Sequence, residues 1–174
     1  MIYLVGGPPR VGKSTLALIA LEEAGIPYCS TDMIVGMLEL GAPQLGVRHG
    51  FHADKANSMT GLLTHFVCCA DIGNDAYLIE GDVITPTFAQ LIAPQLSEMR
   101  AVFLGNSALT LDDLRHAPDW LENSETAEYE TVRHKIVARS QQLRTECEQL
   151  GYAYVEMSQD RNASFAAALK ALDL

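Results

Sequence analysis

The residues with the clearest chemical meaning lie near the start of the chain, where residues 7–14 read GPPRVGKS. Gly7 and Gly12 occupy the two glycine positions of the pattern GxxxxGK[ST], between an apolar run of strand length and a helical pattern. Such a turn points successive backbone N–H groups inward at the positive end of a helix and makes an anion-binding nest. Lys13 would bring a point charge to the β- and γ-phosphates of a nucleotide, and the Ser14 hydroxyl can ligate the Mg²⁺ that bridges them.

The alternative is that a glycine- and proline-rich loop merely joins a strand to a helix. A plain connector needs neither a lysine at a helix start, where the helix dipole disfavours a cation, nor glycines at both positions. Pro8 and Pro9 lack an N–H group, so we expect the cradle to use residues 10–15, with Arg10 pointing outward or onto a phosphate. The predicted nucleotide-binding residues are Gly7, Pro9, Arg10, Val11, Gly12, Lys13, Ser14 and Thr15.

Apolar runs of strand length alternate with helical patterns along the chain, which predicts a parallel sheet covered by crossover helices. The predicted strands are residues 1–5, 26–30, 76–79, 100–104 and 152–157. The predicted helices are residues 14–24, 33–40, 57–70, 86–96, 111–115 and 124–150, and a final helix capped by Asn162. Residues 42–54 are predicted to be a loop, and no linker or repeat divides the 174 residues, so we expect one domain over 1–174.

Composition narrows the possible partners. The chain is 48% hydrophobic with a net charge of −10, which indicates a globular protein and argues against a broad basic face for nucleic acid or anionic lipid. Its four cysteines form no CxxC pair and no zinc-like spacing, so a reducing cytoplasm is the expected location. The run over residues 1–5 is too short for a signal-peptide core, and no stretch approaches the about 20 apolar residues of a membrane span.

With its phosphate loop, the chain resembles the P-loop kinases of small molecules, which include adenylate, shikimate and gluconate kinases and chloramphenicol phosphotransferase. The likeness is closest over residues 1–32 and continues loosely through the acids and arginines described below, without matching a single member. It implies a three-layer α/β P-loop NTPase fold with a five-stranded parallel sheet of order 2-3-1-4-5. It also implies ATP and Mg²⁺, an acceptor-side loop over residues 41–57 and a lid-like segment over residues 105–125.

Two acidic positions follow predicted strands at the edge where open parallel sheets carry their functional loops. With the implied order, the third strand neighbours the strand before the phosphate loop, and the second lies about 9–10 Å away. Glu80 is therefore assigned to the water shell of Mg²⁺, and Asp32 to orienting or deprotonating the acceptor hydroxyl. Glu80 and Gly81 also count among the acceptor-side residues. The alternatives are structural: Asp32 as a helix N-cap and Asp82 as a turn residue.

Phosphoryl transfer spreads negative charge over the transferred group, so such a site needs a mobile cation beyond the lysine. The long predicted helix offers Arg133 and Arg139 as candidate catalytic residues. Arg139 borders the small polar Ser140 in an otherwise apolar stripe and has no acidic residue four positions away, so we favour it as the inward-reaching one. The alternative is that both arginines are solvated or paired on the helix surface.

Polar and aromatic residues gather in the predicted acceptor-side loop: Arg48, His49, Phe51, His52, Asp54 and Lys55. Arg48 and His49 are the predicted acceptor-binding residues among them, for an anionic or hydroxylated acceptor. His49 and His52 have no third ligand at a fixed spacing, so a metal site is disfavoured, and an ordinary surface loop is an equal alternative. Trp120 is expected to anchor the lid or to pack. The family places the nucleotide base at the loop over residues 158–162.

The main hypothesis is therefore an ATP-dependent phosphotransferase acting on a small acceptor. The first alternative is a nucleotide-hydrolysing switch or motor, although the segment after the fourth strand, LGNS, lacks the NKxD pattern of guanine selection. The second alternative is a non-catalytic nucleotide-binding regulator. The acceptor, the choice between ATP and GTP, and the oligomeric state are left open by the sequence.

Overall fold

Five parallel strands form the centre of the computed structural model, which describes residues 1–50, 53–115 and 125–174. Their order in the sheet is β2-β3-β1-β4-β5, as the resemblance implies. The strands are β1 Ile2–Gly6, β2 Tyr28–Ser30, β3 Tyr77–Gly81, β4 Met99–Gly105 and β5 Ala153–Glu156. The strand that leads into the phosphate loop is therefore flanked by β3 and β4, and the carboxyl ends of all described strands meet at one edge.

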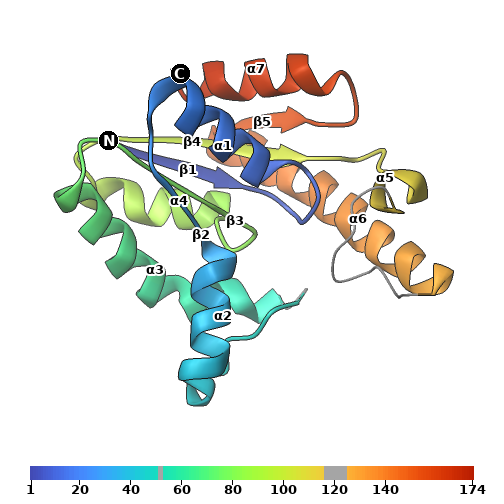
Figure 1. Ribbon diagram of the computed structural model, residues 1–174, viewed down its shortest axis with the longest axis horizontal. Helices are drawn as coiled ribbons and strands as arrows, with labels where there is room; N and C mark the ends of the chain where they lie inside the picture. Colours follow the sequence, from blue (N-terminus) through green and yellow to red (C-terminus); the bar gives the residue numbers. More distant parts are fainter. Residues whose placement is uncertain (51–52, 116–124) are drawn as a thin grey trace.

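Helices cover both faces of the sheet. They are α1 Lys13–Ala24, α2 Thr31–Gly41, α3 Ala53–Gly73, α4 Pro86–Ile92, α5 Leu111–Arg115, α6 Thr126–Leu150 and α7 Arg161–Ala171, with short 3₁₀ helices η1 Pro43–Leu45 and η2 Ala93–Gln95. Figure 1 shows α1 and α7 over one face, α3, α4 and α6 over the other, and α2 projecting away from β2. None of the described helices is long and apolar enough to cross a membrane.

The alternation of side chains along the strands builds two main cores. Ile2 and Leu4 of β1 face the core shared with α3, α4 and α6, whereas Tyr3 and Val5 face the core shared with α1 and α7. A smaller cluster, containing Leu114 of α5, packs against α6. The sheet is thus buried on both sides, which explains why its strands read as continuous apolar runs.

Helix ends follow the expected local chemistry at several points. The Thr85 hydroxyl accepts a hydrogen bond from the Phe88 N–H group at 3.1 Å, with Pro86 at the first helical position of α4. Gly25 and Gly151 end α1 and α6 with φ of 67° and 75°, in the left-handed region that glycine adopts without strain. The Thr110 hydroxyl caps α5 by accepting a hydrogen bond from the Asp113 N–H group at 3.2 Å.

One predicted cap is wrong, and so is one cap that was considered as an alternative. Asn162 does not cap α7, because the Asp160 carboxylate lies one position before the helix and accepts from the N–H groups of Asn162 and Ala163 at 2.9 and 3.3 Å. Asp32 is not an N-cap either. The Ser30 hydroxyl caps α2 by accepting from the Asp32 N–H group at 3.3 Å, which leaves the Asp32 carboxylate exposed in the first turn.

Several boundaries also differ from the prediction. Helix α3 begins at Ala53, four residues before the apolar stripe from which a start at residue 57 was inferred, so residues 42–54 are not a loop throughout. Helix α4 ends at Ile92, because Pro94 has no N–H group to continue the helical hydrogen bonds, and the chain continues as η2. Strand β3 extends to Gly81, which places Glu80 within the sheet rather than after it.

Candidate active site

The phosphate loop lies between β1 and α1, and two of its glycines are required by close packing. Gly7 has a φ of 145°, and a Cβ there would collide with the Leu104 carbonyl at the end of β4. Gly12 has a φ of 100°, and a Cβ there would lie 3.0 Å from the Phe165 ring of α7. The loop is therefore held against β4 on one side and α7 on the other.

Arg10 is one of only two non-glycine residues with positive φ among those that the structure describes, at 69°. A side chain in this region costs about 1–3 kcal/mol and is most often tolerated at functional sites. This unusual backbone conformation lies in the turn between Gly7 and Gly12.

Lys13 is the first residue of α1, and its side chain is only 8% exposed. Its ammonium group folds back over the loop and donates a hydrogen bond to the Pro8 carbonyl oxygen at 2.9 Å. A cation is thereby kept at the N-terminal end of a helix, where the helix dipole alone would disfavour it. This position suits a lysine that stabilises anions in front of the loop.

Ser14 and Glu80 meet across the neighbouring strands. Glu80 is 2% exposed and pairs in register with Val5 of β1, which places its carboxylate beside the loop. The Ser14 hydroxyl donates to Glu80 Oε1 at 3.1 Å. The charge of Glu80 also contributes, after burial, to a raised pKa of the Cys29 thiol. Two oxygen donors of the kind that Mg²⁺ prefers therefore stand together beside the phosphate loop.

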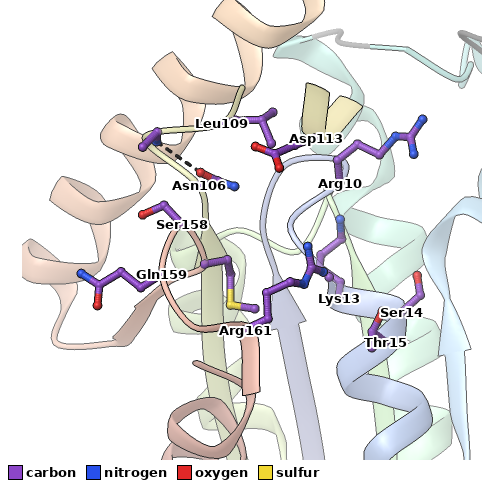
Figure 2. Close-up of a pocket in the computed structure, with 13 residues that line it drawn as sticks. Arg10, Lys13, Ser14, Thr15, Asn106, Leu109, Asp113, Ser158, Gln159 and Arg161 are labelled. Carbon is purple, nitrogen blue, oxygen red and sulfur yellow. Dashed lines mark hydrogen bonds between the residues drawn. The ribbon is translucent and has the colours of Figure 1, made fainter. Parts of the chain in front are cut away.

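A pocket of about 470 Å³ opens in front of the phosphate loop. It is lined by three segments: the loop and the start of α1, the connection from β4 to α5, and the connection from β5 to α7. The lining residues are Arg10, Gly12, Lys13, Ser14, Thr15, Asn106, Ala108, Leu109, Asp113, Met157, Ser158, Gln159 and Arg161. Figure 2 shows the side chains of Lys13, Asn106 and Arg161 directed toward the same space.

Five of the eight predicted nucleotide-binding residues line this pocket: Arg10, Gly12, Lys13, Ser14 and Thr15. Gly7, Pro9 and Val11 do not. The Val11 side chain is instead buried in the core between the sheet, α1 and α7. Gly7 acts through its contact with β4, so its part in the loop is to shape the turn.

The acceptor-side residues lie outside this pocket. Asp32 is exposed two residues beyond Ser30, which pairs in register with Glu80, so it stands at the same edge of the sheet. Gly81 is buried, and a Cβ there would collide with the Thr31 hydroxyl, so the structure has no room for a side chain at this position. The missing side chain allows the end of β3 to pack against the start of α2.

The histidine of the acceptor-side loop packs back onto α2. His49 Nδ1 lies 2.7 Å from Glu39 Oε2, and its ring approaches Gly36. These contacts lower the pKa of the Glu39 carboxyl, chiefly through the hydrogen bond to the His49 side chain. Arg48 is exposed beside it. Phe51 and His52 lie outside the described residues, as do the side chains of Asp54 and Lys55.

The two candidate arginines of α6, Arg133 and Arg139, do not line the pocket. Arg139 makes a bidentate ion pair with Glu146, seven residues further along the helix, at 2.7 and 3.1 Å. Arg133 Nη2 lies 2.7 Å from His134 Nε2. The neighbouring Ser140 is the residue that reaches inward, since its hydroxyl accepts from the Asn106 N–H group at 2.9 Å. Trp120 and the other residues of the predicted lid over 116–124 lie outside the described residues.

The sequence analysis gave no individual role to the pocket side chains of Asn106 and Arg161, although Arg161 lies in the loop over residues 158–162 that was expected to meet the base. Asn106 is 7% exposed directly after β4, and its Oδ1 accepts from the Ala108 N–H group at 3.2 Å. Arg161 begins α7, with its guanidinium 5.7 Å from the Phe165 ring centroid and close to Gly12. The rule that led to Glu80, a polar side chain at the carboxyl end of a strand, could have found Asn106. No motif marks Arg161.

The sheet order, the two helical layers and the glycine-bounded loop between β1 and α1 define the P-loop kinase fold. No family model and no curated protein matches the chain. Among solved structures, it is similar to a gluconokinase from Sinorhizobium meliloti 1021, with a TM-score of 0.65 at 13% identity over 98% of this chain and 90% of the other.

A shikimate kinase from Bacteroides thetaiotaomicron gives a TM-score of 0.65 at 16% identity, over 100% of this chain and 99% of the other. A sugar kinase from Janibacter sp. HTCC2649 gives 0.58 at 14% identity, over 99% and 94%. At this level of identity the likeness establishes the fold, and it confirms the resemblance to small-molecule P-loop kinases without singling out one member.

Proposed function

We propose that the protein is an ATP- and Mg²⁺-dependent phosphotransferase that moves the γ-phosphoryl group of ATP to a small acceptor bearing a hydroxyl or phosphate group. The observation that carries the proposal is the phosphate loop, with a buried Lys13 ammonium at the start of α1 and Ser14 hydrogen-bonded to Glu80. The similar solved structures are a gluconokinase, a shikimate kinase and a sugar kinase, which favours transfer to a small molecule over hydrolysis.

In this proposal, the polyphosphate chain of ATP accepts hydrogen bonds from the backbone N–H groups of residues 10–15. Lys13 exchanges its contact with the Pro8 carbonyl for the β- and γ-phosphate oxygens. Phosphate oxygens carry negative charge and the Pro8 carbonyl does not, so the attraction of opposite charges draws the ammonium toward the phosphates. The helix dipole of α1 adds to the attraction for the phosphates.

Ser14 and Glu80 fit a magnesium ion, because both supply oxygen and Mg²⁺ keeps several waters when it binds beside phosphates. The Ser14 hydroxyl would ligate the ion directly, and Glu80 would hold one of its waters. When bound, Mg²⁺ neutralises charge on the phosphate oxygens. The protein's own part is to keep both oxygens in place, which β1 and β3 do through the register of Val5 with Glu80.

The acceptor is proposed to bind at the α2 side of the same sheet edge, where the Asp32 carboxylate is exposed. Asp32 would orient the acceptor hydroxyl and take its proton, with Glu80 and Gly81 behind it and Arg48 and His49 at the side. Arg133 and Arg139 remain the proposed mobile cations of α6. For Arg139 this role requires release from Glu146, because the ion pair occupies both terminal nitrogens.

The test is to measure ADP release from ATP alone and then with pooled hydroxyl metabolites, nucleosides and nucleotides. The proposal expects little release until an acceptor is added, and dependence on Mg²⁺ throughout. Steady ATP hydrolysis that ignores every acceptor and rises with a protein partner would instead favour the switch or motor. Nucleotide binding without turnover in any mixture would favour the regulator.

A further inference from the structure

A second carboxylate, Glu156, joins two walls of the nucleotide pocket from behind. It is the last residue of β5 and does not itself line the pocket. Ser107 donates to it twice, from the backbone N–H to Oε1 at 2.9 Å and from the hydroxyl to Oε2 at 2.8 Å. The Ser158 N–H group donates to Oε1 at 3.3 Å, and the Tyr154 hydroxyl to Oε2 at 3.1 Å. The carboxylate thus accepts four hydrogen bonds.

Ser107 and Ser158 belong to opposite walls. Ser107 stands between Asn106 and Ala108, which line the pocket from the β4 side, and Ser158 lines it from the β5 side. The last backbone bond between these segments runs from the Met157 N–H group to the Gly105 carbonyl at 2.7 Å. Beyond that point the described hydrogen bonds between the walls pass through Glu156.

The residues around Glu156 favour a charged carboxylate at this position. A Cβ at Gly105 would collide with the Tyr154 hydroxyl, so glycine at the end of β4 gives Tyr154 its path to Glu156. Hydrogen bonds to an ionised acceptor are short and roughly twice as strong as neutral ones. The hydrogen bonds from Ser107, Ser158 and Tyr154 lower the pKa of the Glu156 carboxyl despite its partial burial, so it is ionised at neutral pH.

We propose that Glu156 is a positioning residue that sets the separation of the two pocket walls and, through it, the affinity for the base and sugar of the nucleotide. This inference rests on the proposed nucleotide binding. A pocket whose walls are already held apart at the correct distance spends less of its binding free energy on ordering loops. Without the carboxylate, Ser107 and Ser158 lose their shared acceptor, and both walls gain freedom.

The experiment measures the Kd of MgATP and of MgADP by titration calorimetry on the full chain. Glu156→Ala is expected to weaken both nucleotides about tenfold, equivalent to about 1.4 kcal/mol. Glu156→Gln is expected to stay within about threefold, because its amide oxygen still accepts from backbone N–H groups and hydroxyl groups can reverse their roles. The matched control is Glu148→Ala, an exposed glutamate of α6 paired with Arg144, which should change neither Kd.

A second readout separates this inference from the proposed function. In the nucleotide-free protein, amide hydrogen exchange at residues 106–109 and 157–160 should be faster in Glu156→Ala than in wild type or Glu148→Ala. If wild type binds nucleotide and Glu156→Ala binds it equally well, the positioning role is overturned while the proposed function stands. If wild type binds no nucleotide, the proposed function fails, whereas the exchange data still report whether Glu156 holds the two walls.

A further pair of variants covers the case in which Glu156→Ala does not fold. Ser107→Ala and Tyr154→Phe each remove one donor to Oε2 and keep the carboxylate. Together they are expected to raise the Kd of MgADP about threefold and to speed exchange at residues 106–109. Unchanged affinity and unchanged exchange in this double variant would overturn the proposal.

Discussion

Replacing Gly12 with alanine tests the physical reasoning about the phosphate loop most directly. The backbone at Gly12 has a φ of 100°, which an L-residue adopts at a cost of about 1–2 kcal/mol. The added methyl group would also lie 3.0 Å from the Phe165 ring and 3.1 Å from the Arg161 guanidinium, so both must give way. Since each kcal/mol lowers Tm by about 2–4 °C at this chain length, we expect a loss of about 2–8 °C.

The larger effect should fall on nucleotide binding. Displacing Gly12 moves the first N–H groups of α1, so MgATP should bind at least about tenfold more weakly, a change of about 1.4 kcal/mol. Thermal unfolding by circular dichroism and titration calorimetry measure the two effects separately. Gly25→Ala is the matched control, because Gly25 also has positive φ, at 67°, but a Cβ there meets nothing within 4 Å.

The control should lose about 1–2 kcal/mol of stability from the backbone alone and keep its affinity for MgATP. The reasoning is refuted if Gly12→Ala binds MgATP as wild type does, since the cradle would then not depend on the conformation that glycine permits. It is equally refuted if Gly25→Ala loses affinity to the same extent, because loss of stability alone would then explain both results.

Three further outcomes follow from the site and the cores. Lys13→Ala should weaken MgATP about 10- to 100-fold, the worth of a charge-assisted contact, and abolish transfer; calorimetry with wild-type affinity would contradict this. Asp32→Asn should keep ATP binding and lose acceptor-dependent ADP release by about 10²–10⁴-fold, whereas equal loss of binding would remove Asp32 from the acceptor site. Burial raises the pKa of Cys147 to about 12, so thiol labelling between pH 7 and 9 should reach exposed Cys69 and spare Cys147.

The raised pKa of Cys147 also determines how its contribution to the free energy of unfolding changes with pH. Because its pKa is raised in the folded state, its contribution to stability is complete below the ordinary thiol pKa of 9.0 and declines as pH rises above it, when the unfolded thiol ionises first. Unfolding by urea at pH 8 and pH 10 in wild type and Cys147→Ala should show a smaller loss between the two pH values in the variant. An equal loss in both would exclude Cys147 as its source.

The fold was predictable because its signals are local or strictly periodic. Strand-length apolar runs arise from burial on both faces of the sheet, and Gly25 and Gly151 end helices through their own backbone conformation. The phosphate loop needs glycines where Leu104 and Phe165 press against it, and fixed spacing records that need in the sequence. Helix caps were less predictable, because the true caps Ser30 and Asp160 each lie two residues before another side chain that could cap a helix.

The candidate site was predictable only in part, because its side chains come from connections whose paths depend on tertiary packing. Arg139 has no acidic residue four positions away, so the sequence did not indicate an ion pair. Its partner is Glu146, two turns further along α6. Arg161 reaches Gly12 only because α7 packs beside α1, and no spacing in the sequence encodes that contact. Glu80 was found because strand order alone brings it to the loop.

The clamping of the phosphate loop has a thermodynamic consequence. Because Gly7 packs on the Leu104 carbonyl and Gly12 on the Phe165 ring, the loop has little conformational freedom left to lose when an anion binds. Inorganic phosphate or pyrophosphate, which lack a base, should therefore dock there without the entropic penalty of folding a disordered segment. Their arrival should be limited by diffusion and charge attraction rather than by a slow rearrangement of the chain.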